Sequence, residues 1–339
     1  RPVLDIVLES ATDPQVLAIK ITLYRVGSDS PLVEALMNAA RAGKDITVVM
    51  ELRARFDEAA NIGFAQRMTA AGVRVVYGIV NYKCHAKMML IVRRGARGLR
   101  RYAHIGTGNY HLGNAKLYTD YSLMTSNEQL TEDVHFMFLE LTGLGEMSQL
   151  NLSFRSPFTL YPALLNWIDE ETSAAQLGQP SWIIIKVNSL TEPSVIRALY
   201  RASQAGVKIS LVVRGICSLI PGIPGVSENI RVSSIIGRFL EHHRVYSFCA
   251  GGEERIYLSS ADLMERNLHR RVELCVPILD PTLHAQLKNE LQEVFVKDNS
   301  QAWEMASDCT YTRATTSNTE DIKNAQSMLL EQLSEPMTI

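Results

Sequence analysis

The chain repeats its own pattern of strands and helices, and this repeat limits the folds that are open to it. The segment AARAGKDITVVMEL, which starts at Ala39, is answered in the second half by ASQAGVKISLVVRG, which starts at Ala202. In both segments a helical pattern ends at an Ala-Gly pair and an apolar strand follows. Gly43 and Gly206 of these pairs are 163 positions apart. The sequence therefore predicts two related domains rather than one continuous fold.

Within each half, apolar runs of strand length alternate with amphipathic segments of helical length. Such alternation indicates layers of helices against largely buried strands, which is the α/β class. We therefore predict two α/β domains related by the repeat, each with a mixed sheet flanked by helices. The predicted first domain spans 1–150, the second spans 151–297, and 298–339 is a linker followed by a helix. In the first half we expect strands at 16–24, 46–52, 73–78, 86–92 and 101–108, and helices at 30–44 and 60–72.

The composition excludes several classes of protein. The chain has 339 residues, is 46% apolar and carries a net charge of −2, so any anion site must come from a local cluster of basic residues. Its five cysteines show no C-x-x-C spacing, which argues against a disulfide framework or a structural zinc site and favours a cytoplasmic location. No apolar run has the length of a membrane span. The absence of an initial methionine suggests a piece of a longer protein.

A histidine stands two residues before a cation at an equivalent place in each half. His85-x-Lys87 precedes the apolar run that starts at Met88, and His242-x-Arg244 lies 157 positions later. A turn of small residues follows each pair, at 106–109 with Asn109 and at 259–262 with Asp262. The two half-sites can face one another across a pseudo-twofold axis. One imidazole can then attack phosphorus while the other assists, and the cations neutralise phosphate oxygens.

The structural alternative is that each histidine only fills a strand entrance. A single histidine at such a place is usually a satisfied structural residue, and a glycine pair often marks no more than a turn. The recurrence of histidine, cation and turn in both halves favours a functional role for His85 and His242.

This repeated His-x-Lys pattern resembles the phospholipase D superfamily. That superfamily also has an aspartate five positions after the lysine, where this chain has Val92 in the first half and Cys249 in the second. Longer motifs are similar to the C-terminal half of bacterial polyphosphate kinases. The motifs are ITLYR, ELRARFDEAANI, HAKMMLIVRR, YAHIGTGNYH, LYTDYSLMT, LVVRGICSLIPGIPG, SENIRVSSIIGRFLEHHRVY and YLSSADLMERN. The resemblance runs in register from about Leu17 to Pro277.

The resemblance assigns roles to particular residues. It implies that His85 is the histidine that becomes phosphorylated and that His242 is a second essential histidine. The implied nucleotide-phosphate contacts are Tyr118, Arg214 and His242, and Arg25 and Arg55 are implied at a magnesium site. Guanidinium groups have no lone pair for a metal, so we expect these two arginines to reach magnesium through phosphate. From the repeat itself we add Lys87 as a catalytic residue, and Asn109 and Arg244 as phosphate contacts.

The expected reaction is reversible transfer of the ATP γ-phosphate to the end of an inorganic polyphosphate chain. ATP or ADP, polyphosphate and Mg²⁺ are the implied substrates and cofactor. The resemblance further implies N-terminal and head domains elsewhere in a longer chain, a homo-oligomer, no specific nucleic acid, and a cytoplasmic location with peripheral attachment to the inner face of the membrane as a further option. Two rival functions stay open, a phospholipase D-like phosphodiesterase or nuclease and a non-catalytic module that binds polyanions.

Overall fold

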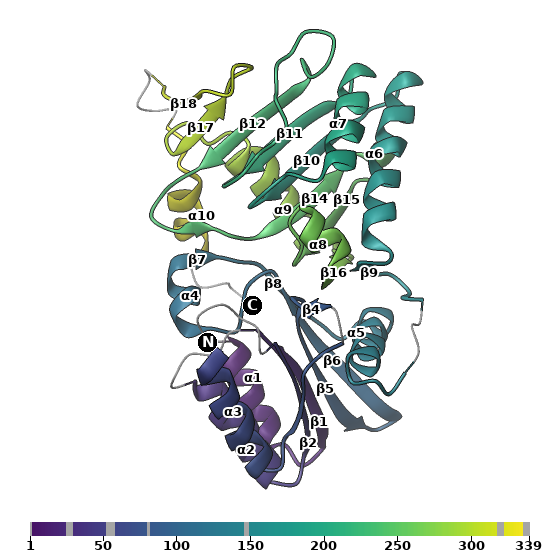
Figure 1. Ribbon diagram of the computed structural model, residues 1–339, viewed down its shortest axis with the longest axis vertical. Coiled ribbons are helices and arrows are strands. Elements are labelled where there is room, and N and C mark those ends of the chain that lie inside the picture. Colours follow the sequence, from purple (N-terminus) through teal and green to yellow (C-terminus); the bar gives the residue numbers. More distant parts are fainter. Residues whose placement is uncertain are drawn as a thin grey trace. The chain divides into compact units, whose positions relative to one another are not determined.

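The computed structural model describes residues 2–24, 30–51, 58–79, 82–145, 149–316 and 322–334. It divides the chain into two compact units. Unit 1 comprises 1–116, 120–157 and 269–276, and unit 2 comprises 117–119, 158–268 and 277–339. The colours of Figure 1 show that both units contain segments that are far apart in the sequence.

Unit 1 contains a mixed sheet with the strand order β3-β2-β1-β5-β6-β8. The strands are β1 (Val16–Leu23), β2 (Asp45–Met50), β3 (Arg74–Val76), β5 (Lys87–Gly95), β6 (Gly98–Gly106) and β8 (Ser122–Thr125). The strands β1, β2 and β3 run parallel, whereas β5, β6 and β8 join them by antiparallel pairing. The mixed sheet with flanking helices confirms the predicted α/β class.

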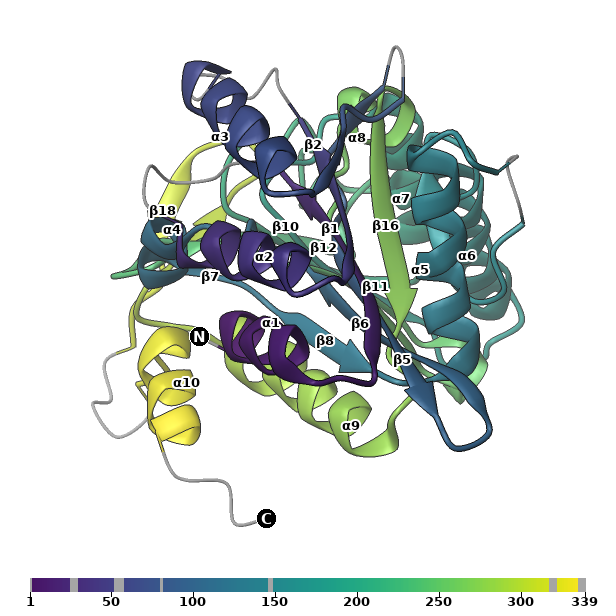
Figure 2. The ribbon, with the colours of Figure 1, turned by 90° about the horizontal axis from the view of Figure 1, so that it is seen from below.

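Helices cover both faces of this sheet, as Figure 2 shows. They are α1 (Pro2–Thr12), α2 (Pro31–Arg41), α3 (Glu58–Ala70) and α5 (Glu128–Leu141). The short helix α4 (Leu112–Leu117) has no buried residues. Because side chains alternate along a strand, Ile19 and Ile21 of β1 point to the same face, where Leu36 of α2 packs with them. The helix α5 packs against β5 and β6. These buried layers give β5, which follows His85 directly, a rigid setting.

Three short strands add a second element to unit 1. The strand β16 (Arg271–Pro277) pairs parallel with β4 (Lys83–Cys84) and antiparallel with β9 (Phe154–Ser156). In the β16–β4 pair, Val272 lies opposite Cys84. A segment from late in the chain therefore lies beside the residue that precedes His85.

Unit 2 repeats the central pairing of unit 1. The strand β10 (Trp182–Val187) pairs parallel with β11 (Lys208–Val213) and antiparallel with β14 (Arg244–Phe248), as β1 does with β2 and β5. The other strands are β12 (Ile230–Ile235), β15 (Arg255–Ser259), β17 (Ala302–Met305) and β18 (Tyr311–Arg313). The helical segments are α6 (Leu160–Gln176), α7 (Pro193–Gln204), α8 (Glu265–His269), α9 (Pro281–Asn289), α10 (Ala325–Ser334), η1 (Ala250–Gly252) and η2 (Glu290–Phe295). The internal repeat is thus present in the strand pairing.

The repeated Ala-Gly pairs end equivalent helices. Gly43 follows α2 with φ of +86°, and Gly206 follows α7 with φ of +101°. In each case the glycine N–H donates to a carbonyl three residues earlier, and the next residue donates to a carbonyl five residues earlier. Such a C-cap requires a left-handed residue, which glycine adopts without a steric penalty. The glycines therefore fix where the strands β2 and β11 begin.

The predicted ranges 1–150, 151–297 and 298–339 remain a proposal, and the compact units differ from them in two respects. First, 269–276 belongs to unit 1 and 117–119 belongs to unit 2. Second, the predicted linker after residue 297 contains β17 and β18, and β17 extends the sheet of unit 2 by pairing with β12. The predicted helix near the C-terminus is α10.

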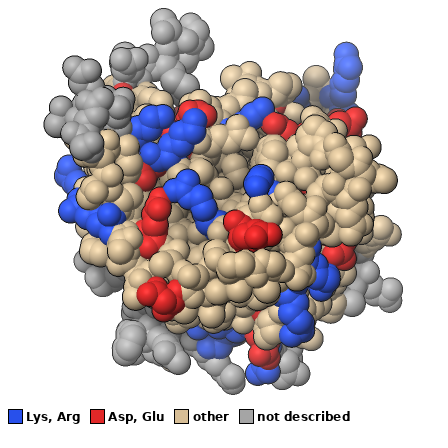
Figure 3. Space-filling model, turned by 90° about the horizontal axis from the view of Figure 1, so that it is seen from above, with Lys and Arg blue, Asp and Glu red and all other residues tan. Residues whose placement is uncertain are grey.

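Charge is mixed on the surface of the described chain. On the face shown in Figure 3, Lys and Arg side chains lie among Asp and Glu side chains, in keeping with the net charge of −2. Among the described helices, none is both long and apolar enough to cross a membrane.

Candidate active site

His85 lies between β4 and β5, and its backbone is fixed from two sides. The N–H groups of His85 and Ala86 both donate to the carbonyl of Val272 at 2.9 Å. On the other side, the Thr22 hydroxyl donates to the Ala86 carbonyl at 2.7 Å and accepts from the Met88 N–H at 3.0 Å. These bonds hold the strand entrance at a defined place, which a catalytic side chain requires.

A buried carboxylate orients the His85 ring. The Nδ1 atom of His85 lies 2.9 Å from the carboxylate of Glu273, which is fully buried on β16. A carboxylate at Nδ1 favours the tautomer with the proton on that nitrogen, which leaves the lone pair on Nε2. Tyr24 packs edge-on against the ring at 5.2 Å between centroids. In this tautomer Nε2 is the ring atom that is chemically able to act as a nucleophile.

The environment also keeps His85 unprotonated. Burial lowers the pKa of His85 to about 3, although Glu273 works in the opposite direction and raises it. Lys87 lowers it further by charge repulsion. At neutral pH the ring is therefore neutral, which a nucleophile must be.

The two cations that follow the histidines make the same bond in both units. Lys87 is buried and donates from Nζ to the His85 carbonyl at 2.6 Å, and Arg244 donates from Nη1 to the His242 carbonyl at 2.9 Å. Arg244 also pairs with Asp262, through Nη2 at 3.0 Å and Nε at 3.3 Å. Both cations thus support the backbone of their own histidine. Catalysis by Lys87 and phosphate contact by Arg244 stay predictions.

The glycine turn at 106–109 is occupied by a side chain of unit 1 itself. The Asp120 carboxylate accepts from the Thr107 hydroxyl at 2.7 Å and lies so close to Gly108 that a Cβ there would collide with it. A side chain at position 108 would therefore displace the Asp120 carboxylate. The Oδ1 atom of Asn109 is buried without a hydrogen-bond partner in the described part of the chain. Its contact with phosphate stays a prediction.

His242 lies in unit 2 between the short strand β13 (Leu240–Glu241) and β14. The strand β13 pairs in parallel with β7 (Tyr118–Thr119). This pairing brings the Tyr118 ring to 5.1 Å from the His242 ring, and the His242 N–H donates to the Thr119 hydroxyl at 3.3 Å. Tyr118 and His242, which are 124 positions apart in the sequence, are therefore neighbours in the fold.

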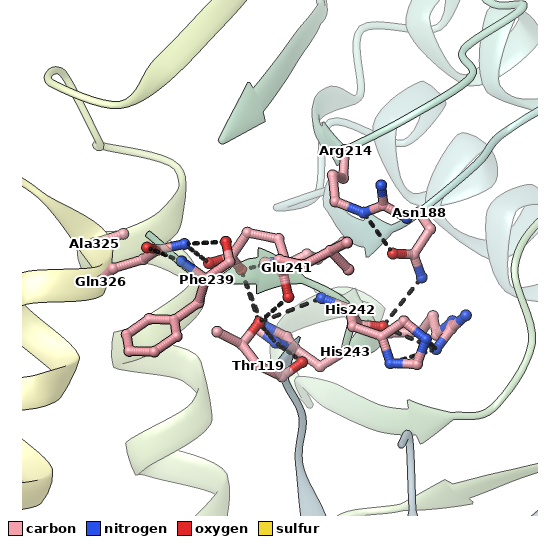
Figure 4. A network of polar contacts seen from close by, with 12 residues as sticks. Thr119, Asn188, Arg214, Phe239, Glu241, His242, His243, Ala325 and Gln326 are labelled. Carbon is pink, nitrogen blue, oxygen red and sulfur yellow. Dashed lines mark hydrogen bonds and ion pairs between the residues drawn. The ribbon is translucent and has the colours of Figure 1, made fainter. Parts of the chain in front are cut away.

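Asn188 joins Arg214 to this cluster, as Figure 4 shows. Its Nδ2 donates to the His242 carbonyl at 3.1 Å, and its Oδ1 accepts from Nε of Arg214 at 3.0 Å. The Asn188 backbone N–H in turn donates to Asp262 at 2.7 Å. The sequence reading had not singled out Asn188. The cluster thus holds an imidazole, a phenol and a guanidinium close together, which are groups that bind phosphate oxygens.

The residues implied at the magnesium site, Arg25 and Arg55, lie outside the described residues. Over the described ranges, no group of three or more His, Cys, Asp and Glu side chains could hold a metal ion. The groups around His85 and His242 are mainly imidazole, ammonium and guanidinium donors, which fit phosphate oxygens and do not fit a direct magnesium ligand set. No chemical step is therefore assigned to the metal.

Glu273, like Asn188, is a site residue that the sequence did not predict. It is 188 positions from His85 and reaches it only through the pairing of β16 with β4. One signal was available, since Glu273 is a single charge within the apolar run from Val272 to Val276. A carboxylate inside a buried strand needs a partner, and such groups often mark functional sites.

Comparison with known proteins identifies the family. The family models "Polyphosphate kinase C-terminal domain 1" and "Polyphosphate kinase C-terminal domain 2" match residues 1–147 and 154–326. The chain is 56% identical to a polyphosphate kinase of Pseudomonas aeruginosa over 99% of its own length and 49% of that protein. The crystal structure of polyphosphate kinase from Porphyromonas gingivalis matches with a TM-score of 0.91 and 36% identity, over 98% of this chain and 50% of that chain.

A more distant match concerns the fold alone. Phosphatidylserine synthase from Haemophilus influenzae is 12% identical with a TM-score of 0.59, over 98% of this chain and 91% of that chain. This similarity agrees with the predicted phospholipase D-like architecture. The chain spans about half the length of the curated relatives it matches. The chain belongs to the polyphosphate kinase family, of which it carries the two C-terminal domains.

Proposed function

We propose that the protein containing this chain transfers the γ-phosphate of ATP reversibly to the end of a polyphosphate chain, through a phosphohistidine at His85. Family membership supports the kind of reaction. The observation that carries the proposal is the buried Glu273 carboxylate 2.9 Å from Nδ1 of a neutral His85, because it leaves Nε2 ready to attack. An imidazole that is oriented by a buried carboxylate is a common arrangement for an activated nucleophile.

In the proposed first step, Nε2 of His85 attacks the γ-phosphorus in line. A P–N bond forms, the bond from the γ-phosphorus to the bridging oxygen breaks, and ADP leaves with that electron pair. In the second step a terminal oxygen of polyphosphate attacks the phosphohistidine, so a P–O bond forms and the P–N bond breaks. His85 returns to its neutral state. As the ring becomes cationic on phosphorylation, Glu273 would stabilise the positive charge.

We propose that His242 serves the same transfer as an acid–base group, with Tyr118 and Arg214 as phosphate contacts. Their grouping around Asn188 and β7 supports this assignment, because one anion could bind several of them. The proposal also includes the other domains of a longer chain, a homo-oligomer and a cytoplasmic setting. Peripheral attachment to the inner face of the membrane is a further option.

The rival functions predict different products. A phosphodiesterase would hydrolyse a model phosphodiester, whereas the proposed enzyme would make ADP and lengthen polyphosphate only when both substrates are present. A binding module would retain polyphosphate after His85→Ala and form no ADP. The test is to incubate the full-length protein with ATP and polyphosphate and measure ADP, chain length and diester hydrolysis. Diester hydrolysis without ADP formation would replace the proposal with the first rival.

Glu273→Gln should lower kcat by about 10- to 100-fold, the range found when a partner that orients a metal-ligating histidine is replaced. An amide can donate to Nδ1 and so favour the tautomer with the proton on Nε2, where attack must occur. Because the lost carboxylate raises the pKa of His85, the ring stays neutral in the variant. The loss should therefore be the same from pH 6 to 9.

Glu9→Gln, on the exposed surface of α1, is the matched control and should behave as the wild type. The measurement is kcat against pH for both variants. A loss that disappears at high pH would show that Glu273 acts by changing protonation, contrary to this account.

Arg25→Ala and Arg55→Ala should weaken nucleotide binding. Neither substitution should change magnesium binding in the absence of nucleotide. A guanidinium can fork onto phosphate oxygens but cannot ligate magnesium, so these arginines should act on the metal only through phosphate. The measurement is magnesium binding by calorimetry, with and without nucleotide. A tight magnesium site in nucleotide-free protein, abolished by either substitution, would contradict the assignment.

A further inference from the structure

The C-terminal helix α10 sends one buried side chain to the segment that carries His242, as Figure 4 shows. The Oε1 atom of Gln326 accepts from the Phe239 N–H at 2.9 Å, and its Nε2 donates to the Phe239 carbonyl at 2.9 Å. The same Nε2 donates to the carboxylate of Glu241 at 2.7 Å. The side-chain amide thus bonds both backbone groups of Phe239, as a neighbouring strand would, and both of its N–H groups are used.

The chain leaves no spare room around this amide. A Cβ added to Gly237 would lie 2.6 Å from Oε1 and 2.9 Å from Cδ of Gln326. Both distances are shorter than the contacts that Cβ atoms make, so any side chain at 237 would displace the amide. The glycine and the glutamine therefore fit one another.

The start of α10 is itself held in place, so Gln326 approaches from a fixed base. Asp298 is buried and accepts from the Ala325 N–H at 2.7 Å through Oδ2. Its Oδ1 accepts from the backbone N–H groups of 300, 301 and 302, where β17 begins. One carboxylate thus ties the first residue of α10 to the sheet of unit 2.

Glu241, which precedes His242 in the chain, links Gln326 to His242. Glu241 is buried, and its other carboxylate oxygen pairs with Lys186 at 2.7 Å. A buried ion pair is costly unless its remaining hydrogen-bonding sites are satisfied, and Gln326 satisfies one of them. The next peptide N–H, that of His242, donates to Thr119. The position of β13 therefore sets where the His242 ring lies.

We propose that Gln326 is a positioning residue for His242, which it holds by fixing the segment from Phe239 to Glu241. In this proposal the C-terminal helix α10 stabilises the position of a residue that takes part in phosphoryl transfer. This inference rests on the proposed function for its kinetic consequence, but its structural part can be measured without any activity.

The test compares Gln326→Ala with Gln332→Ala in the full-length protein. Gln332 is the same residue type on the same helix, and it is exposed. Two quantities are measured, the steady-state constants for polyphosphate synthesis and the amide exchange rates of segment 239–243. Misplacement of a catalytic group by about 1 Å can cost on the order of 10²-fold in rate. We expect Gln326→Ala to lower kcat by about 10- to 100-fold, with KM changed less than about threefold.

Amide exchange separates positioning from loss of structure. Gln326→Ala should accelerate exchange in 239–243 and leave the central strands β10 and β11 unchanged, and Gln332→Ala should alter neither. Unchanged exchange in 239–243 would overturn the proposal, and so would a kcat within twofold of the wild type. Faster exchange throughout unit 2 would also overturn it, since Gln326 would then only stabilise the domain.

Gln326→Glu supplies a second variant of the same shape. Its carboxylate would face Glu241, whose other charged or titratable neighbours are Lys186 and His243. Repulsion from Glu241 would raise the pKa of the new group, so the variant should recover as the pH falls. We expect the ratio of variant to wild-type kcat to rise from pH 8 to pH 6, and a ratio independent of pH would contradict the assigned contact. If the wild-type protein makes no polyphosphate, the proposed function fails. The exchange measurement still decides whether Gln326 holds β13.

Discussion

His85→Ala should abolish phosphorylation of the protein by γ-labelled ATP and reduce polyphosphate synthesis below detection. The reason is that the account contains one nucleophile, Nε2 of His85, and assigns the covalent intermediate to it alone. The label on the wild-type protein should be labile in acid and stable in alkali, as a phosphoramidate is. The measurement is label retained by the purified full-length protein after separation from nucleotide.

A second variant is needed to control for folding, because His85→Ala removes the hydrogen bond between His85 and the buried Glu273. Loss of a hydrogen bond to a buried charged group destabilises a protein. His85→Gln offers an amide to Glu273 but has no nucleophilic nitrogen, so it should fold and still fail to label. His284→Ala, on α9 in unit 2, should label as the wild type does. Label that persists in His85→Gln would place the intermediate on another residue.

His242→Ala should lower kcat by about 10²- to 10⁴-fold, the range for a positioned acid–base group. The ring is fixed by its neighbours, since its backbone bonds to Thr119 and Asn188 and its face meets Tyr118. If His242 acts only in the transition state, kcat and kcat/KM should fall by the same factor. Steady-state kinetics at saturating and limiting ATP measure both quantities.

A rise in KM with an unchanged kcat would give His242 a different role. It would then be a group that binds substrate and transition state equally, as a nucleotide contact does. Turnover equal to that of the wild type would remove His242 from the site altogether. Tyr118→Phe is a useful companion, because it keeps the ring contact with His242 and removes only the hydroxyl.

The sequence predicted those parts of the fold that depend on local patterns. The strands around β1, β2 and β5 and the helix ends at Gly43 and Gly206 follow from apolar periodicity and from the preference of glycine for a left-handed C-cap. The repeat also placed His85 and His242 at equivalent strand entrances. The sequence therefore predicted those features that depend on residues close to one another in the chain.

Contacts between distant segments escaped this reasoning. Glu273 reaches His85 only because β16 pairs with β4, and no periodicity specifies the partner of a short strand. Gln326 reaches Glu241 because Asp298 fixes the start of α10, whereas the sequence predicted a helix there but not its contacts. The strands β17 and β18 are only four and three residues long, which is too short for an alternating pattern to stand out. Sheet pairing and buried side-chain bonds decide these features.

The atom that carries the phosphate decides whether His85 is the nucleophile. Full-length protein would be labelled with ATP, digested under alkaline conditions and analysed by mass spectrometry and phosphorus NMR. Because Nδ1 of His85 is bonded to Glu273, the account predicts phosphate on Nε2 of His85. Phosphate on Nδ1 of His85, or on any serine, aspartate or other histidine, would contradict it.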